Sequence, residues 1–433
     1  MEADVSVERT ERMPRDFLSA AGLSPQEAAF YHRGSPELVA AGVVFTPSTG
    51  GTTHFICGDR LLVVDTSLFL FARGILDEVR RRFSDAPVEA IVYTHGHIDH
   101  VSGAHFYLQE AEERGFPRPR VVGHADVARR FDRYRMLDRQ NNFINNFQFA
   151  MKGPMRAFSV TPWVYPDVTY YEQMELTVGG ERFELYHSRG ETDDQTWVWC
   201  PKRRVACAGD MFIWATPNVG NPLKVPRYCL DLAVNLERMA ALKPLHLLPG
   251  HGPAIWGEDQ VQDALLSTAA WLRSIHDQVV EGMNEGKFLE DILRDIKYPP
   301  NDRPWLKPIY DHPEFVARNI YRLYGGWYDG NPANILPAHS HDVARELISV
   351  TGSQGLLARA RQLRDEGDLQ MACHLVDFVR RGEPENREAW QMWRDLFKAR
   401  LEMEPSLMAR GVYLSAIDEA ERHLTDSRLT DRR

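Results

Sequence analysis

Short apolar runs separated by glycine and aspartate dominate the chain after about residue 40. The runs GVVFTP, THFICGD and RLLVVDTS have the length of β-strands and end at residues that favour tight turns. LFARGILDEVRRRF instead has apolar residues three and four positions apart, which predicts an amphipathic helix, and VEAIVYT predicts a buried strand. RVVGHADVARRFDRYRMLDR repeats the order of strand and then helix. This alternation is typical of an α/β sandwich, in which helices cover the outer faces of sheets.

Residues 140–170 interrupt the pattern. The stretch is rich in asparagine, aromatic residues and proline and shows little regular periodicity, so we expect an irregular segment. Such a segment is either a wall of a substrate pocket or a purely structural connection, and the sequence favours neither.

Strand patterns return in MELTVGGERFELYHS, QTWVWCP, RRVACAGDMFIW and LHLLPGHGP, and the chain after about residue 258 has mostly helical spacing. We therefore predict a catalytic domain over residues 1–260 and an all-helical domain over residues 261–433. Within the second, residues 356–403 resemble a tetratricopeptide-type hairpin broken at Gly367 and Pro384.

Composition limits the possible partners and the cellular compartment. The formal net charge of the 433 residues is −10 and no long block of Lys and Arg occurs, so we expect no nucleic-acid partner. The first thirty residues contain no apolar segment, which argues against a signal peptide or a membrane span. Five cysteines without a C-x-x-C pair suit reduced thiols, and we expect a cytoplasmic protein with no membrane partner.

The chemistry is concentrated in YTHGHIDHVSG, which begins at Tyr93. Three histidines and an aspartate, His95, His97, Asp99 and His100, follow a predicted strand within six residues. Imidazole nitrogen and carboxylate oxygen are common ligands of zinc. The spacing H-x-H-x-D-H can supply two ligands to each of two neighbouring metal ions.

Three further candidate ligands follow strand patterns downstream, each beside a glycine. These are Glu191 in HSRGET, Asp210 in CAGD and His251 in LLPGHG. Glycine lets the backbone carry a side chain close to a metal ion without steric conflict.

In this ordered set the chain resembles the metallo-β-lactamase superfamily over roughly residues 40–260. The resemblance implies an αββα sandwich followed here by the helical domain. It also implies two metal sites, one held by His95, His97 and Glu191 and the other by Asp99, His100 and His251, with Asp210 bridging them. Most members have histidine where this chain has Glu191, so His187 is the rival ligand, and Asp193 and Asp194 are more distant competitors.

Glu191 is a feature of the alkyl-sulfatase branch of that superfamily. NIYRLYGGWYDGNPANILPA, from Asn319 to Ala338, resembles the dimerisation signature of the branch, and AGDMFIWATPNVGNPLKVPRY is similar to a further stretch. The resemblance implies a homodimer formed through the helical domain. Full-length relatives carry a sterol-carrier-like C-terminal domain for which this chain ends too early, so we expect an ester with a short or otherwise different organic group.

The implied function is a dinuclear zinc hydrolase that acts on alkyl or aryl sulfate monoesters through a metal-bound hydroxide, with Asp99 orienting that hydroxide and moving its proton. Iron and manganese are the other candidate metals. Three carboxylates and a hydroxide would make the cluster nearly neutral, so a sulfate group needs cationic side chains nearby. The candidates are Lys224, Arg227 and Arg189, with Arg318 and Arg322 as weaker ones.

Three other functions compete with this hypothesis. The same metal site could act on a carboxylic ester, a lactone or a thioester. It could hold iron for oxidation and reduction, or the helical half could be an interaction platform beside an inactive site.

Overall fold

The structure is a computed structural model that describes residues 33–149 and 156–425 of the chain. The predictions made for the first thirty residues therefore lie outside the described part. Contacts divide the chain into two compact units. Unit 1 comprises Met1–Asn142 and Arg156–Gly325, and unit 2 comprises Phe143–Met155 and Gly326–Arg433.

Unit 1 contains two sheets. The first has seven strands in sequence order, antiparallel from β1 to β4 and parallel from β4 to β7. Its strands are β1 (Glu37–Ala40), β2 (Val43–Thr46), β3 (Thr52–Cys57), β4 (Arg60–Val64), β5 (Val88–Val92), β6 (Arg120–His124) and β7 (Val168–Tyr170).

The second sheet has six strands in the order β13-β12-β11-β10-β9-β8. All pairs in it are antiparallel except β11 with β12. Its strands are β8 (Gln173–Val178), β9 (Glu181–His187), β10 (Thr196–Cys200), β11 (Val205–Ile213), β12 (His246–His251) and β13 (Ile255–Trp256).

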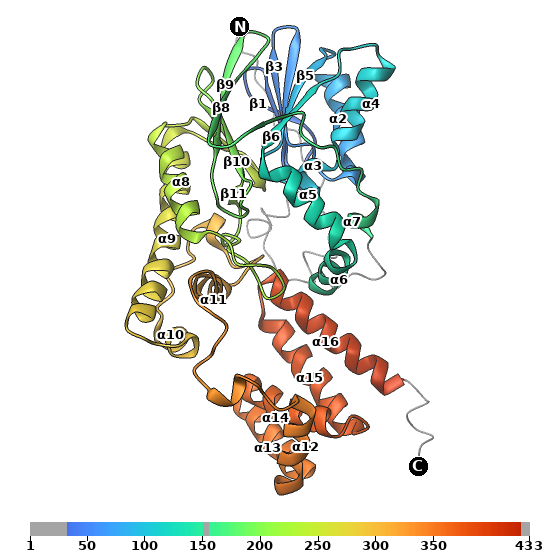
Figure 1. Ribbon diagram of the computed structural model, residues 1–433, viewed down its shortest axis with the longest axis vertical. Helices are drawn as coiled ribbons and strands as arrows, with labels where there is room; N and C mark the ends of the chain where they lie inside the picture. The colour runs from blue at the N-terminus through green and yellow to red at the C-terminus, as the bar shows by residue number, and fades with distance from the viewer. Residues whose placement is uncertain (1–32, 150–155, 426–433) are drawn as a thin grey trace. The chain divides into compact units, whose positions relative to one another are not determined.

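The two sheets pack face to face with helices outside them (Figure 1). Residues of both inner faces, such as Phe55 and Phe183, form the central core. The outer face of the first sheet is covered by α2 (Phe69–Arg82), α4 (Ala104–Glu113) and α5 (Asp126–Met136). The outer face of the second is covered by α8 (Cys229–Ala241) and α9 (Glu258–Asn284). The predicted αββα sandwich is confirmed.

Burial explains why central strands read as continuous apolar runs. All nine residues of β11 are buried, because the other sheet covers one face and helices cover the other. β8, at the edge of its sheet, has exposed residues that alternate with buried ones toward its end. Hydrophobic patterning therefore finds the central strands most easily.

The remaining helices of unit 1 are α3 (Ile98–Val101), α7 (Ala157–Val160), α10 (Leu289–Asp295), η2 (Pro304–Leu306) and α11 (Pro313–Tyr324). Unit 2 contains η3 (Pro332–Asn334), α12 (Ser340–Thr351), α13 (Ser353–Glu366), α14 (Leu369–Gly382), α15 (Arg387–Met403) and α16 (Leu407–Thr425), and their apolar residues form a core of their own. The helices break at Gly367, which has a left-handed conformation, and around Pro384, as predicted. The all-helical region that follows the sandwich is thus confirmed.

The prediction of an irregular segment over residues 140–170 was wrong in part, because α6 (Asp138–Gln148) is a helix. It begins in unit 1 and ends in unit 2. The boundary between residues 260 and 261 stays a prediction, and the contacts group α9, α10 and α11 with the sandwich. Among the described helices, none combines the length and apolar character needed to cross a membrane.

Candidate metal centre

The histidine cluster lies where β5 ends. His95 follows the strand directly, and His97 is the residue before the short helix α3, which carries Asp99 and His100. Glu191 lies in the turn between β9 and β10, Asp210 lies within β11, and His251 ends β12. The seven candidate ligands, which are spread from residue 95 to residue 251 of the sequence, thus meet at one edge of the sandwich.

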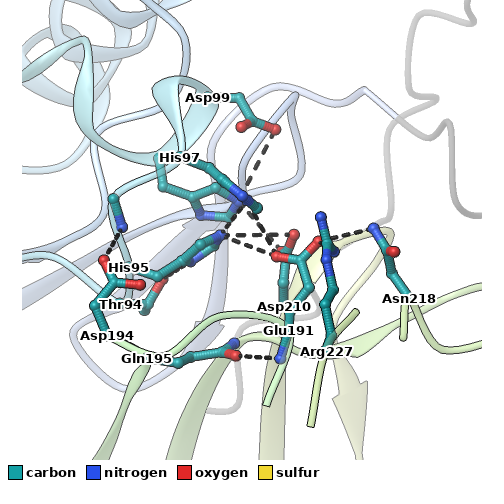
Figure 2. A network of polar contacts seen from close by, with 12 residues as sticks. Thr94, His95, His97, Asp99, Glu191, Asp194, Gln195, Asp210, Asn218 and Arg227 are labelled. Carbon is teal, nitrogen blue, oxygen red and sulfur yellow. Dashed lines mark hydrogen bonds and ion pairs between the residues drawn. The ribbon is translucent and has the colours of Figure 1, made fainter. Parts of the chain in front are cut away.

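The first ligand group contains His95, His97 and Glu191 (Figure 2). Glu191 Oε2 lies 3.2 Å from His95 Nε2 and 3.1 Å from His97 Nδ1, and the two imidazole nitrogens are 2.8 Å apart. Asp210 belongs to the same group, and every candidate ligand atom in it lies within 4.8 Å of the others.

The second group contains Asp99, His100 and His251. Asp99 Oδ2 lies 3.5 Å from His251 Nε2 and 3.9 Å from His100 Nε2. Asp210 approaches this group too, with Oδ1 at 3.2 Å from His100 Nε2 and Oδ2 at 3.4 Å from His251 Nε2. Asp210 therefore has the position expected of a bridging ligand.

The donor set fits a pair of divalent cations. Three buried atoms at its centre, Glu191 Oε2, His100 Nε2 and Asp210 Oδ1, make no well-directed hydrogen bond within the described residues, and each faces another ligand atom at 3.1–3.2 Å. Buried polar atoms are rarely left unpaired, because their desolvation is costly. Imidazole and carboxylate are the ligand types that zinc, iron and manganese accept. Whether the seven residues bind a metal ion stays a prediction.

The pKa shifts in the first group favour the protonation states that a metal ligand needs. Burial lowers the pKa of His97 to about 4, although Glu191 opposes this, so the ring is neutral at pH 7, as a metal ligand must be. Burial also opposes the ionisation of Glu191, but Arg227 and His97 outweigh it and the pKa of Glu191 lies well below its ordinary value.

The pKa shifts in the second group favour positive charge. Burial alone would lower the pKa of His100, but Asp210, Asp65 and Asp99 raise it well above its ordinary value. The pKa of Asp210 lies well below its usual range, since His251 and His100 outweigh the opposing effect of burial. Clustered carboxylates at this point attract positive charge, which a bound cation would supply.

Hydrogen bonds from outside the cluster fix the orientation of the ligands. Asp65 accepts from the Thr94 backbone N–H at 2.7 Å and from its hydroxyl at 2.6 Å, and lies 2.7 Å from His100 Nδ1. His100 Nε2 therefore faces the cluster. Asp194 accepts from the Gly96 backbone N–H at 2.9 Å and pairs with Arg130 at 2.8 Å, which anchors the loop between His95 and His97.

Glu191 is held from three sides. Its backbone N–H donates to Gln195 Oε1 at 2.9 Å, and its Oε1 accepts from Asn218 Nδ2 at 2.8 Å and forms an ion pair with Arg227. Sequence patterns had given no role to Asn218 or Gln195, and Arg130 and Asp65 were likewise missed. Of these residues, Asp65 had a sequence signal, because it directly follows the predicted strand RLLVV.

The predicted substrate-binding cations lie in different settings. Arg227 is buried and pairs with Glu191, whereas Arg189 is exposed and pairs with Asp231 at 3.1 Å. Lys224 is partly buried; desolvation, followed by the repulsion of Arg227, lowers its pKa to about 8 despite the attraction of Glu191 and Asp99. Arg318 and Arg322 are occupied within α11, by Glu314 and Asn319.

The rival ligands lie outside both groups. His187 stacks on His124 with ring centroids 3.7 Å apart, and its Nδ1 lies 3.0 Å from the Gln195 carbonyl oxygen. Asp193 and Asp194 both pair with Arg130. Glu191 is the acidic residue of this stretch that faces His95 and His97.

Comparison with family models matches residues 49–251 to the metallo-beta-lactamase superfamily and residues 289–423 to the alkyl sulfatase dimerisation family. With the two stacked sheets and the ligand geometry, the first match shows that residues 49–251 form a domain of the metallo-β-lactamase superfamily. The second match confirms the alkyl-sulfatase-like branch that Glu191 and the Asn319–Ala338 stretch had indicated.

Several curated proteins are similar along most of the chain. A linear primary-alkylsulfatase from Pseudomonas sp. (strain ATCC 19151) is 25% identical over 84% of this chain and 72% of its own length. An alkyl/aryl-sulfatase from Saccharomyces cerevisiae is 21% identical over 88% of this chain and 62% of its own length. Among solved structures, a stereoselective inverting sec-alkylsulfatase from Pseudomonas sp. has a TM-score of 0.80 at 21% identity, covering 91% of this chain and 67% of that one. That last likeness concerns the fold.

Proposed function

We propose that this chain is a metal-dependent hydrolase that cleaves alkyl or aryl sulfate monoesters at a pair of zinc ions. One observation carries the proposal: Asp210 lies between two groups of three candidate ligands, in a chain similar over 84% of its length to a linear primary-alkylsulfatase. When bound, two divalent ions would polarise the ester and lower the pKa of a water molecule into the neutral range.

The chain supplies the residues that orient the reactants. His97 and Asp99 are the most exposed of the seven side chains, at 20% and 24%, so an ester reaches the cluster from their side. Asp99 combines exposure with a carboxylate 3.5 Å from His251. It is therefore the group best placed to accept a proton from an attacking water and to return it to the leaving oxygen.

Lys224 is the best candidate for holding the sulfate group. It is close enough to Glu191 and Asp99 for both to act on its pKa, which places its ammonium charge near both ligand groups. With a pKa of about 8 it is mostly charged at pH 7. A cation held in partly buried surroundings binds an anion more strongly than one in open water.

The test is a substrate panel on protein reconstituted with zinc, iron or manganese. Alkyl sulfate, 4-nitrophenyl sulfate, a lactone, a thioester and 4-nitrophenyl acetate are compared by release of sulfate, acid, thiol or phenol. We expect metal-dependent release of sulfate that is lost in His97→Ala. Turnover of the carboxylic ester, lactone or thioester alone would contradict the sulfatase assignment and select the other hydrolase function. If sulfate is released, hydrolysis in labelled water would show whether the C–O or the S–O bond breaks.

Lys224→Met should raise KM for a sulfate ester by about 10-fold to 100-fold, because a charge-assisted hydrogen bond contributes about 1.5–3 kcal/mol. Metal content should stay at the wild-type value. The matched control is Arg189→Met, whose side chain is exposed and paired with Asp231, and which should leave KM unchanged. Equal KM values in the wild type and Lys224→Met would exclude Lys224 as the sulfate contact.

We also propose a homodimer formed through unit 2, which contains most of the region matched by the dimerisation family. Several large apolar residues of this unit are exposed: Trp327 and Leu336 are 73% and 91% exposed, and Val350 on α12 is 81% exposed. Val343, Leu347 and Val350 also line a hollow of ≈ 620 Å³. Large exposed apolar patches mark interaction sites in proteins.

A cytoplasmic location stays a proposal too; the unpaired state of all five cysteines is compatible with it.

A further inference from the structure

The two carboxylate oxygens of Glu191 have separate partners. Oε1 accepts from Asn218 Nδ2 at 2.8 Å and pairs with Arg227 Nη1, while Oε2 faces His95 and His97. Figure 2 shows Arg227 and Asn218 on one side of the carboxylate and the two imidazoles on the other. One oxygen is thus engaged by the protein, and the other is directed into the ligand group.

Arg227 is buried nearly as deeply as the ligand that it contacts, with side-chain exposures of 7% for Arg227 and 3% for Glu191. A guanidinium in such a place is strongly destabilising without an anionic partner. The backbone reinforces the pairing, since Arg227 N–H donates to the Val219 carbonyl at 3.1 Å and Tyr228 N–H donates to the Gly190 carbonyl at 3.0 Å. The segment carrying Arg227 is therefore fixed to the turn that carries Glu191.

Charge gives the pairing a consequence for the metal site. Two divalent ions held by three carboxylates together with one hydroxide would carry about zero net charge. The guanidinium of Arg227 offsets the charge of Glu191, so the loaded site would keep one unit of positive charge. The pair then presents the metal with a ligand that is neutral overall, as an imidazole would be.

We propose that Arg227 is a positioning residue for Glu191, and that the two side chains act as one neutral ligand in which Arg227 holds Oε1 so that Oε2 alone meets the metal. The inference rests on the metal site of the proposed function but not on its substrate. It reassigns Arg227 from the predicted contact with sulfate to the support of a ligand. The sulfate group is left to Lys224.

The experiment measures zinc stoichiometry and affinity in Arg227→Met, Arg227→Lys, Glu191→His and the double variant Glu191→His/Arg227→Met. Arg227→Met should weaken one of the two zinc sites by about 10-fold to 100-fold, the usual effect of removing a partner that orients a ligand. The zinc affinity of Arg227→Lys should lie between those of the wild type and Arg227→Met, because lysine keeps the positive charge but lacks the planar guanidinium group. The double variant replaces the charged pair with a neutral ligand and no buried arginine, so it should bind two zinc ions and fold even if Glu191→His does not.

Cobalt substitution gives a second readout. The visible absorption of the cobalt-loaded double variant should change in wavelength relative to the wild type, because imidazole replaces a carboxylate ligand, while the stoichiometry stays at two. The matched control is Arg203→Met, which breaks a similarly buried pair with Glu181, 2.6 Å apart, away from the site. It should lower the thermal stability and leave both zinc affinities unchanged.

Arg227→Met with two zinc sites of wild-type affinity and only a raised KM for sulfate esters would overturn the proposal and make Arg227 a substrate contact. A folded double variant that binds one zinc ion would overturn it as well. If the wild type binds two zinc ions and hydrolyses no sulfate ester, the proposed substrate fails, while the metal measurements still decide the role of Arg227.

Discussion

Single residues at the metal centre differ in how far the sequence reveals them. His95, His97, Asp99 and His100 are adjacent in the chain, so one short motif discloses four candidate ligands. Their supporting partners come from distant positions: Asp194 is 98 residues from the Gly96 N–H that it accepts, and Arg227 is 36 residues from Glu191. An arginine or an asparagine has no local pattern that distinguishes a ligand partner from a surface residue. Ligands are therefore predictable here, while their supports become visible only in the fold.

The pH dependence of stability provides a prediction at the scale of one residue. His54 is fully buried, and burial followed by the repulsion of Arg80 lowers its pKa to about 3, below the value of 6.5 for an exposed ring. Between these values the unfolded chain binds more protons than the folded one, so stability is fully present above pH 6.5 and decreases as the pH falls. At pH 5 the loss should be about 2 kcal/mol.

Denaturant unfolding of metal-free protein at pH 7.5 and pH 5 measures this loss. His54→Gln keeps a polar atom for the Tyr107 hydroxyl, which lies 2.9 Å from His54 Nε2, but it cannot titrate. The variant should lose about 2 kcal/mol less than the wild type over this pH range. Parallel pH dependences in the two proteins would show that His54 is not the group responsible.

Helices and strands were predicted best where hydrophobic residues form the pattern that is typical of the element. The strands before His95 and around Asp210 are continuous apolar runs, and both appear where expected. The helix α6 was missed because polar residues form much of its buried face: Asn142, Asn145 and Gln148 are buried together with Ile144 at helical spacing. Asn142 bonds to the Ser159 hydroxyl at 2.8 Å and accepts from the Phe158 N–H. Hydropathy cannot detect a helix whose packing depends on amide side chains.

Gly250 in the strand β12 allows a test of the position of Asp210. A Cβ on Gly250 would lie 1.9 Å from Asp210 Oδ1, so Gly250→Ala must displace the carboxylate that approaches both ligand groups. We expect the variant to fold but to bind neither zinc ion with wild-type affinity, as measured by metal content after dialysis.

The matched control is Gly74→Ala in the helix α2, where a Cβ meets nothing within 4 Å. It should keep both metal ions and gain about 0.5–1 kcal/mol of stability, because alanine favours a helix interior. Full zinc binding by Gly250→Ala would show that Asp210 can move away without loss, which contradicts a bridging role.

The whole molecule combines two units with separate cores. The change from strand patterns to helical spacing near residue 258 was visible in the sequence, yet the contacts place α9 to α11 with the sandwich. Helical spacing reveals the type of an element but not the core that it joins. For α9 the reason is that its apolar face, including Leu265 and Leu272, covers the outer face of the second sheet.

Assembly is the prediction at this scale. Val350→Asp places a charge on the most exposed apolar position of α12, where a dimer would bury it, so the variant should be a monomer in light scattering while the wild type is a dimer. Leu70→Asp is the control, because Leu70 is 68% exposed on α2 in unit 1, and it should leave the dimer intact. A monomeric wild type would contradict assembly through this surface. A Val350→Asp variant that dimerises with the same affinity as the wild type would contradict it too.

The central claim is that seven side chains, His95 to His251, hold two cations with Asp210 between them. Anomalous scattering at the zinc edge, from crystals of the zinc-loaded protein, tests it most directly. The account predicts two peaks roughly 3.5–4 Å apart, one within bonding distance of His95, His97 and Glu191 and the other beside Asp99, His100 and His251. A single peak, or peaks away from Glu191 and Asp210, would contradict it.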